Sequence, residues 1–161
     1  MSKSPQEATV KTLNSLIHLD YDAIDAYDAA IKRATDDNVR AALLEFRADH
    51  ETHTEKLQAW VEKLGGKPAT KSDLKAVLTS GKVAISSLSE TMGILKAMQS
   101  NEEETNQKYD DALSTVTEPP ELVEVLLHNR DDERKHKGWI DNHLDQTNQT
   151  PYPHTIAPNS R

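Results

Sequence analysis

Two stretches of the chain place metal-binding side chains three residues apart. They are Glu133-x-x-His136 and His50-x-x-His53. On a helix, residues three apart lie on the same face, one above the other, so each pair can present two ligands in the same direction. Carboxylate oxygens and imidazole nitrogens are suitable ligands for iron, manganese and zinc ions. Because one such pair arises by chance in many acidic helices, the elements that carry the two pairs decide whether they act together.

Both pairs lie in segments where apolar residues recur at steps of three and four, the spacing of a helix with one buried face. The first segment begins at Ser4-Pro5, where serine can cap the helix and proline suits its first turn, and it fades at residues 35–38. The second begins near Val39 and ends at Gly65-Gly66, which favour a left-handed cap. Both segments are therefore predicted to be helices.

Two further helices are predicted in the second half of the chain. The third begins near Ser89 and ends before Glu118-Pro119-Pro120, and the fourth extends from these prolines to Gln146. The less regular stretch from about 65 to 89 is too long for a hairpin loop, so we expect a crossover that contains short helical segments. The buried face of the third helix is predicted to pass through Leu95, Gln99, Glu102, Asn106, Tyr109 and Leu113, and that of the fourth to end at His143.

This pattern predicts an all-α fold, a four-helix bundle in which two antiparallel hairpins are joined by one long crossover. Residues 1–146 would form the bundle, and residues 147–161 would form a polar C-terminal tail that contains prolines. With 161 residues, the chain is long enough to bury a hydrophobic core.

The predicted topology brings the candidate ligands to one height in the bundle. Within an antiparallel hairpin, residues equidistant from the turn lie side by side. Asp20 and His53 are equidistant from the first turn, and Glu102 and His136 are equidistant from the second. Each half also carries a tyrosine seven residues after its carboxylate, which indicates an internal repeat. The predicted polar layer contains Asp20, His50, His53, Glu102, Glu133 and His136.

The energetics of burial favour a cation in this layer. Asp20, Glu102 and Glu133 would be three carboxylates inside an apolar bundle, and each buried ion costs several kcal/mol unless it is compensated. Lys and Arg are absent from the four predicted buried faces. Protonated histidines can compensate the carboxylates, but divalent metal ions satisfy such a layer more completely.

Some residues near the layer have two interpretations. His50 is either a ligand or a hydrogen-bond partner of Glu133 or another carboxylate. An aspartate directly precedes each motif, and these residues, Asp49 and Asp132, either cap the histidines or are plain surface charge. The two repeated tyrosines are expected to be core residues.

The sequence resembles the ferritin-like superfamily, the di-metal carboxylate bundles that include bacterioferritins and rubrerythrins. The resemblance covers roughly residues 5–146. In the bacterioferritin first helix a metal-binding glutamate precedes a tyrosine by seven residues, and Asp20 falls at its position before Tyr27. The endings at 65–68 and the region 101–109 are closer still to bacterial ferritin-like proteins of unknown function.

The resemblance implies a metal ligand at each of the six candidate positions, with two departures from the family pattern. Asp20 is one methylene shorter than the expected glutamate, and His50 replaces a glutamate expected to bridge two metals. Three anionic ligands would face the four positive charges of two divalent ions, which weakens the case for iron oxidation and storage. A mononuclear site, a zinc site and an asymmetric di-metal site all remain open.

The expected function is therefore metal binding at a His/carboxylate site for one or two transition-metal ions. Iron is the first expectation, and manganese and zinc are the alternatives. If the protein is an enzyme, the resemblance implies a di-metal oxidoreductase that acts with oxygen or peroxide. The alternative is a non-catalytic bundle, stress-related or partner-binding, whose polar layer is held by internal hydrogen bonds.

Composition limits the partners. A net charge of −8 disfavours nucleic acid and anionic membranes, since both would repel the chain. Cysteine is absent, which excludes disulfides and thiolate ligands. The N-terminus has no apolar signal core and no apolar run approaches a membrane span, so a soluble cytoplasmic protein is expected. The resemblance further implies a homodimer.

Overall fold

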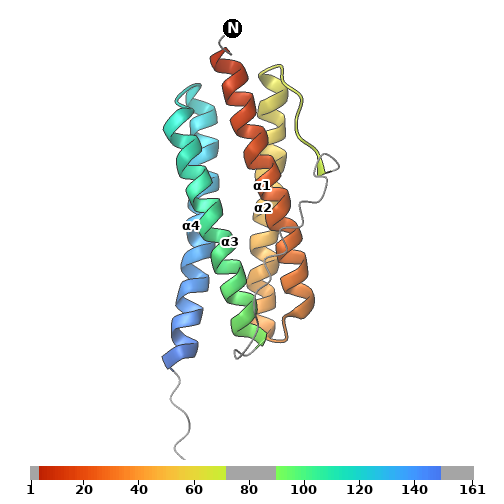
Figure 1. Cartoon of the computed structure of the whole chain (residues 1–161), viewed down its shortest axis with the longest axis vertical. Helices are drawn as coiled ribbons and strands as arrows, with labels where there is room; N and C mark the ends of the chain where they lie inside the picture. The colour runs from red at the N-terminus through yellow and green to blue at the C-terminus, as the bar shows by residue number, and fades with distance from the viewer. Residues whose placement is uncertain (1–3, 72–89, 150–161) are drawn as a thin grey trace, which may run out of the picture.

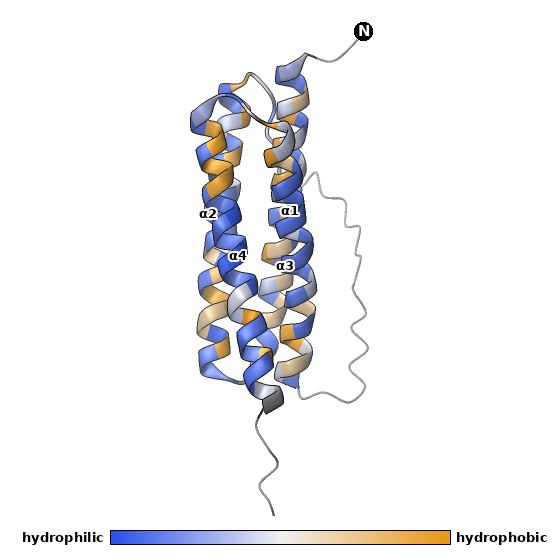
Figure 2. Cartoon of the chain, turned by 90° about the vertical axis from the view of Figure 1, so that its left-hand side faces the viewer, coloured by the Kyte–Doolittle hydropathy of each residue, from blue (hydrophilic) through white to orange (hydrophobic). Residues whose placement is uncertain are grey.

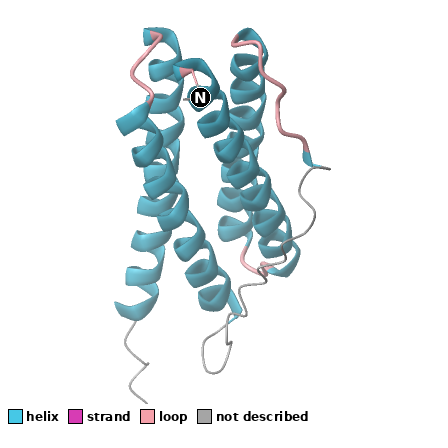
Figure 3. Ribbon diagram, turned by 45° about the horizontal axis from the view of Figure 1, so that its top comes forward, coloured by secondary structure: helices cyan, strands magenta, loops and turns pink. Residues whose placement is uncertain are grey.

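The computed structural model describes residues 4–71 and 90–149, which form four long helices (Figure 1). They are α1 (Pro5–Arg33), α2 (Asp37–Lys63), α3 (Glu90–Thr115) and α4 (Pro120–Gln149). The described residues form helices and loops, with no strand among them (Figure 3). The all-α prediction is confirmed. The predicted helical segments of the crossover and most of the predicted tail lie outside the described residues.

The ends of α1 and α2 form where the sequence signals them. Ser4 and Glu7 make a reciprocal capping box: the Glu7 amide donates to Ser4 Oγ at 3.2 Å, and the Ser4 amide donates to Glu7 Oε2 at 3.0 Å. Asp36 caps α2 by accepting a hydrogen bond from the Val39 amide at 3.0 Å. These contacts satisfy amide groups that have no partner inside the helix.

The end of α2 depends on two glycines. Gly65 has a φ of 75°, which a residue without a side chain adopts at little cost. The Gly66 amide then donates to the Val61 carbonyl at 2.9 Å, which completes a Schellman-type cap. A Cβ atom at Gly66 would lie 2.6 Å from Cγ1 of Val10, so this glycine also lets the end of α2 approach the start of α1.

The helices have the predicted connectivity. In Figure 1, α1 and α2 form one antiparallel hairpin, and α3 and α4 form the other. Arg33 at the end of α1 pairs with Glu90 at the start of α3 over 3.4 Å, so the crossover returns the chain to the end of the bundle where α2 begins. As a result α2 and α3 run parallel, and each hairpin contributes two helices to a shared interior.

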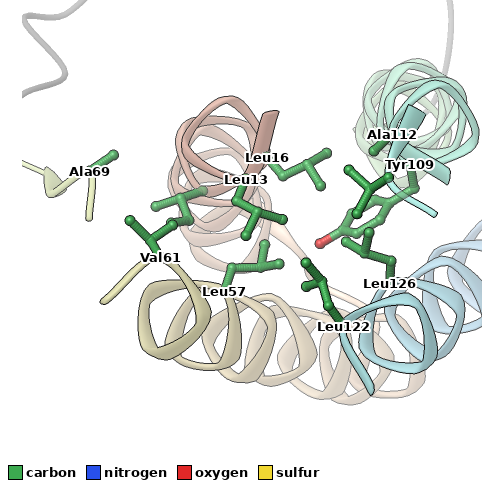
Figure 4. Close-up of a cluster of buried hydrophobic side chains, with 11 residues drawn as sticks. Leu13, Leu16, Leu57, Val61, Ala69, Tyr109, Ala112, Leu122 and Leu126 are labelled. Atoms are coloured by element: carbon green, nitrogen blue, oxygen red, sulfur yellow. The ribbon is translucent and has the colours of Figure 1, made fainter. Parts of the chain in front are cut away.

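The core consists of two apolar clusters on either side of a polar layer. One cluster lies near the N-terminus of α1 and contains Leu13, Leu57, Leu122 and Leu126, whose side chains converge in Figure 4. The other lies near the opposite end and contains Val39, Leu43, Phe46, Leu95 and Ile140. In Figure 2, α4 passes from hydrophobic residues at its upper end to a hydrophilic stretch at mid-height.

The buried face of α3 differs in part from the predicted one. Leu95, Glu102 and Tyr109 are buried as expected, but the positions between them are filled by Met98, Thr105 and Ala112. Gln99, Asn106 and Leu113 are only half-buried. On α4, Leu144 is the last buried position up to residue 147, while His143 is half-buried and stacks on Trp139. The predicted and the observed sets of buried positions both follow alternating steps of three and four residues. Contact with the neighbouring helices decides which set is buried.

None of the four described helices combines the length and the apolar character that crossing a lipid bilayer requires.

Candidate metal centre

The structure brings all six predicted side chains together in the layer between the two apolar clusters. One comes from α1, one from α3, and two each from α2 and α4. Each is fully buried, with an exposed fraction of 0%: Asp20, His50, His53, Glu102, Glu133 and His136. Since α1 and α3 face α2 and α4 across the bundle, the equal heights predicted from the two turns place these groups within reach of one another.

Four of the side chains surround a first position. His50 Nδ1 lies 2.9 Å from Asp20 Oδ1 and 3.4 Å from Glu133 Oε1. His53 Nδ1 lies 3.1 Å from Glu133 Oε1 and 3.7 Å from Asp20 Oδ1. The first position is therefore bounded by two imidazole nitrogens and two carboxylate oxygens.

A second position lies on the other side of Glu133. His136 Nδ1 is 3.7 Å from Glu102 Oε2 and 3.8 Å from Glu133 Oε2. His50 faces this position as well, with Nε2 at 3.5 Å from Glu102 Oε1. Each of the two positions is thus surrounded by a group of four side chains that could hold a metal ion, and His50 and Glu133 belong to both groups.

The outer nitrogens of two histidines are held by aspartates from the opposite helix. His53 Nε2 on α2 lies 3.0 Å from Oδ2 of Asp132 on α4. His136 Nε2 on α4 lies 2.9 Å from Oδ2 of Asp49 on α2. Of the two interpretations of these aspartates, the contact with histidine is the correct one. Each bond turns the other ring nitrogen, Nδ1, toward the layer and fixes the ring's orientation.

The layer also contains hydrogen bonds from tyrosines that the sequence interpretation assigned only to the core. Tyr109 donates to Asp20 Oδ2 at 2.9 Å and accepts a bond from Asn129 Nδ2 at 3.2 Å. Tyr27 donates to Glu102 Oε1. A helical side chain leans toward the N-terminus of its own helix, so a tyrosine seven residues after a carboxylate reaches back to the height of that carboxylate. This lean was the signal that could have identified both contacts.

Several buried nitrogen and oxygen atoms of the layer have no hydrogen-bond partner among the described residues. They are His50 Nε2, His53 Nδ1, Glu102 Oε2, both Glu133 oxygens and His136 Nδ1. Leaving a buried polar atom unpaired is costly, more so when the group is charged. All these atoms belong to the two positions described above, and imidazole and carboxylate form a donor set that suits a transition-metal ion. The buried groups are therefore compatible with a metal site.

The three carboxylates have different environments. Burial raises the pKa of Asp20, but the hydrogen bond with His50 and the charge attraction of His50 and His53 outweigh it and lower the pKa. Burial likewise raises the pKa of Glu102, but the nearby imidazoles of His136 and His50 outweigh that effect and lower the pKa well below the usual range. For Glu133 burial prevails, and the pKa is raised.

The histidines respond in the opposite direction. Burial lowers the pKa of His53, but Asp20 and Glu133 more than offset that effect and raise the pKa to about 10. In the same way, Glu102 and Glu133 outweigh burial and raise the pKa of His136 to about 9. The pKa of His50 is also raised well above its ordinary value of 6.5. Without a metal ion, the raised pKa values of the three histidines favour imidazolium charges opposite to those of the carboxylates.

The helix order, the single crossover and the central layer of carboxylates and histidines define a ferritin-like four-helix bundle. The chain is similar to the ferritin-like, diiron-carboxylate proteins from Bacillus anthracis, with 20% sequence identity, coverage of 89% of this chain and 99% of that one, and a TM-score of 0.72. It is also similar to a two-domain protein from Anabaena variabilis that contains DJ-1/ThiJ/PfpI-like and ferritin-like domains, with 15% identity and a TM-score of 0.73. That match covers 97% of this chain and 42% of the Anabaena protein, so the chain spans less than half of its length.

The chain belongs to the family described as a domain of unknown function, DUF2383, which matches residues 8–115. This family has the ferritin-like fold. No curated protein matches the chain.

Proposed function

We propose that this protein binds one or two transition-metal ions in the layer between its two apolar clusters. The observation that supports this most strongly is the set of buried, unpartnered imidazole and carboxylate atoms that surround the two positions. A protein interior rarely leaves this many polar atoms without partners. Iron is the first candidate, and manganese and zinc suit the same donor set.

The roles of the residues follow from their contacts. Asp20, His53, Glu102, Glu133 and His136 would supply the ligand atoms, with His50 between the two positions. Tyr109 and Tyr27 orient the carboxylates of Asp20 and Glu102 by donating hydrogen bonds to them. Complete burial of the six side chains keeps bulk water out of the layer.

An iron or manganese ion held here would supply redox chemistry, and a zinc ion would supply Lewis acidity. Oxygen- or peroxide-linked oxidoreductase activity is therefore the catalytic form of this proposal. It rests on the analogy of fold, since a fold hosts many functions. A homodimeric assembly and a cytoplasmic location complete the proposal, and light scattering of the purified protein tests the first of these.

The second candidate function is a non-catalytic bundle with a hydrogen-bonded polar layer. The observation that favours it is the balance of three imidazoles against three carboxylates, with His50 Nδ1 bonded to Asp20 at 2.9 Å. Protonated histidines would neutralise the layer without a metal ion. The two functions differ in whether metal binds and stabilises the fold.

The decisive experiment measures metal content and its effect on stability. The protein is purified without chelating resin, analysed for bound elements, stripped with a chelator, and titrated with Fe²⁺ under anaerobic conditions, Mn²⁺ or Zn²⁺. A metal that binds only the native state stabilises it by about 2.7 kcal/mol at a concentration one hundred times its Kd. Substoichiometric metal and an unchanged melting temperature on re-addition would contradict metal binding.

A matched pair of variants places the effect in the layer. Glu133→Gln removes the charge of the carboxylate that both positions share, and it should abolish the metal-dependent rise in melting temperature. Glu124→Gln makes the same chemical change at an exposed position of α4 and should leave that rise intact. Equal behaviour of the two variants would place any bound metal outside the layer.

A further inference from the structure

We infer that the layer is built to hold one divalent ion tightly, between Asp20, His50, His53 and Glu133, and that the position beside Glu102 and His136 is a weaker second site. This inference rests on the proposed metal binding and states where and how many ions bind. It depends on the geometry around His50, which stands where the family resemblance implies a bridging glutamate.

At the first position, the four nitrogen–oxygen separations are close to the edges of a tetrahedral site. Ligands at about 2.0–2.1 Å from a zinc ion form a tetrahedron whose edges are about 3.3–3.4 Å. The distances from the nitrogens of His50 and His53 to the oxygens of Asp20 and Glu133 are 2.9, 3.1, 3.4 and 3.7 Å. Four donors are thus already placed at close to the required separations, so little rearrangement would accompany binding.

The second position is wider. The distances between the nitrogens and oxygens that bound it are 3.5, 3.7 and 3.8 Å, all longer than the edge of a tetrahedral site. Hydrogen bonds from outside hold the ligands of the two positions in the same way. At the second position, Tyr27 bonds to Glu102 and Asp49 bonds to His136. At the first position, Tyr109 bonds to Asp20 and Asp132 bonds to His53. The difference between the positions therefore comes from the shared residues.

His50 cannot serve both positions in the way a bridging carboxylate can. Its Nδ1 faces the first position, at 2.9 Å from Asp20 Oδ1, while its Nε2 faces the second at 3.5 Å from Glu102 Oε1. A neutral imidazole has one nitrogen with a free lone pair and one that carries hydrogen. Binding an ion through Nδ1 therefore leaves an N–H group pointing at the second position, where it can donate to Glu102 and opposes a second cation.

Charge favours the same arrangement. Asp20 and Glu133 together balance one divalent ion. A second divalent ion would bring the total to four positive charges against three carboxylates, in a layer from which water is excluded. Uncompensated charge in such a layer is costly.

Titration of metal-free protein with Zn²⁺ and Co²⁺ tests this inference. Calorimetry with Zn²⁺ should give one tight equivalent per chain, and Co²⁺ at one equivalent should give the intense visible absorption of tetrahedral coordination. Loss of a ligand should weaken the tight equivalent by more than about 100-fold, since even the outer partners of ligands are worth about 10–100-fold. We therefore expect such a loss for His53→Asn, whereas His136→Asn should retain the tight equivalent.

The variant His50→Glu provides the converse test. A carboxylate at this position can face both positions at once, and it should raise the stoichiometry to two ions per chain. If a histidine variant loses its helical circular dichroism, Asp20→Asn and Glu102→Gln make the same comparison with side chains of unchanged size. Two equivalents of similar affinity in the unmodified protein, or equal losses for the two positions, would overturn the inference while leaving metal binding intact. If the unmodified protein binds neither Zn²⁺ nor Co²⁺ nor any of the metals tested above, the proposed function itself fails.

Discussion

The hydroxyl of Tyr109 on α3 donates a hydrogen bond of 2.9 Å to Oδ2 of Asp20 on α1. The mirror contact joins Tyr27 on α1 to Glu102 on α3. Each tyrosine follows the carboxylate of its own helix by seven residues but bonds the carboxylate of the neighbouring helix. The internal repeat of the sequence thus becomes a reciprocal link between the two hairpins.

Removing the Tyr109 hydroxyl should destabilise the fold. Tyr109→Phe leaves a buried Asp20 oxygen without its donor and Asn129 without its acceptor, and an unsatisfied buried polar group costs about 1–3 kcal/mol. Urea unfolding of the metal-free protein measures the loss. Tyr27→Phe is the matched control, and it should cost less because its hydroxyl has one such bond. If Tyr27→Phe lowers the free energy of unfolding more than Tyr109→Phe does, the expectation that the Tyr109 hydroxyl contributes more stability is wrong.

The aspartates outside the layer should control metal affinity without being ligands. Asp132→Asn weakens the bond to His53 Nε2 and allows the ring to turn, and such outer partners are worth about 10–100-fold in metal affinity. Calorimetric titration with Zn²⁺ measures the change. The neighbouring Asp131 is mostly exposed, so Asp131→Asn should leave the affinity unchanged. A merely structural role of Asp132 would lower the melting temperature of the metal-free protein without changing the Zn²⁺ affinity.

The stability of the metal-free protein should fall as pH rises above 6.5. His53 and His136 keep their protons in the folded state up to pKa values of about 10 and about 9, whereas the ordinary value is 6.5. Between these limits the folded state binds more protons than the unfolded chain, so stability decreases with pH, by up to about 1.4 kcal/mol per unit for each histidine. Denaturant unfolding between pH 6.5 and 8.5 in the presence of a chelator measures the slope. Saturating Zn²⁺ should remove it, and a flat profile without metal would contradict the expectation.

At acid pH the dependence is opposite, and stability should fall as the pH is lowered. The lowered pKa values of Asp20 and Glu102 contribute stability that is present above their ordinary values of 3.8 and 4.5 and is lost as pH falls through the folded-state values. Glu133 acts against this trend because its pKa is raised. The metal-free protein should therefore be most stable at weakly acid pH, between about 4.5 and 6.5.

Two adjacent leucines on α4 should separate core packing from surface effects. Leu126 is fully buried and Leu127 is 36% exposed. Leu126→Ala should cost about 2–5 kcal/mol, because it removes buried methyl groups and leaves a cavity. Leu127→Ala should change stability by about 0.5 kcal/mol or less. Similar losses for both would indicate that Leu127 is covered by a partner, which concentration-dependent melting would then reveal.

The sequence by itself determined the four long helices of the described ranges, their order and the six residues of the layer. Residue spacing was sufficient, because a period of three and four identifies a buried helical face and a polar residue on it stands out from its apolar neighbours. The capping box at Ser4 and the glycine end of α2 also follow from local chemistry that needs no tertiary contact. The resemblance to a known family pointed to the same positions.

Only the tertiary structure decided which atoms meet. The choice of Met98 over Gln99 on α3, the pairing of Asp132 with His53, and the inward turn of Nδ1 all depend on how neighbouring helices rotate about their axes. A shift of one residue in the buried face is a rotation of about 100° on a helix, and spacing within one helix does not fix that rotation relative to another. Packing between the helices fixes this rotation, and it thereby also sets the different spacings of the two positions on either side of His50.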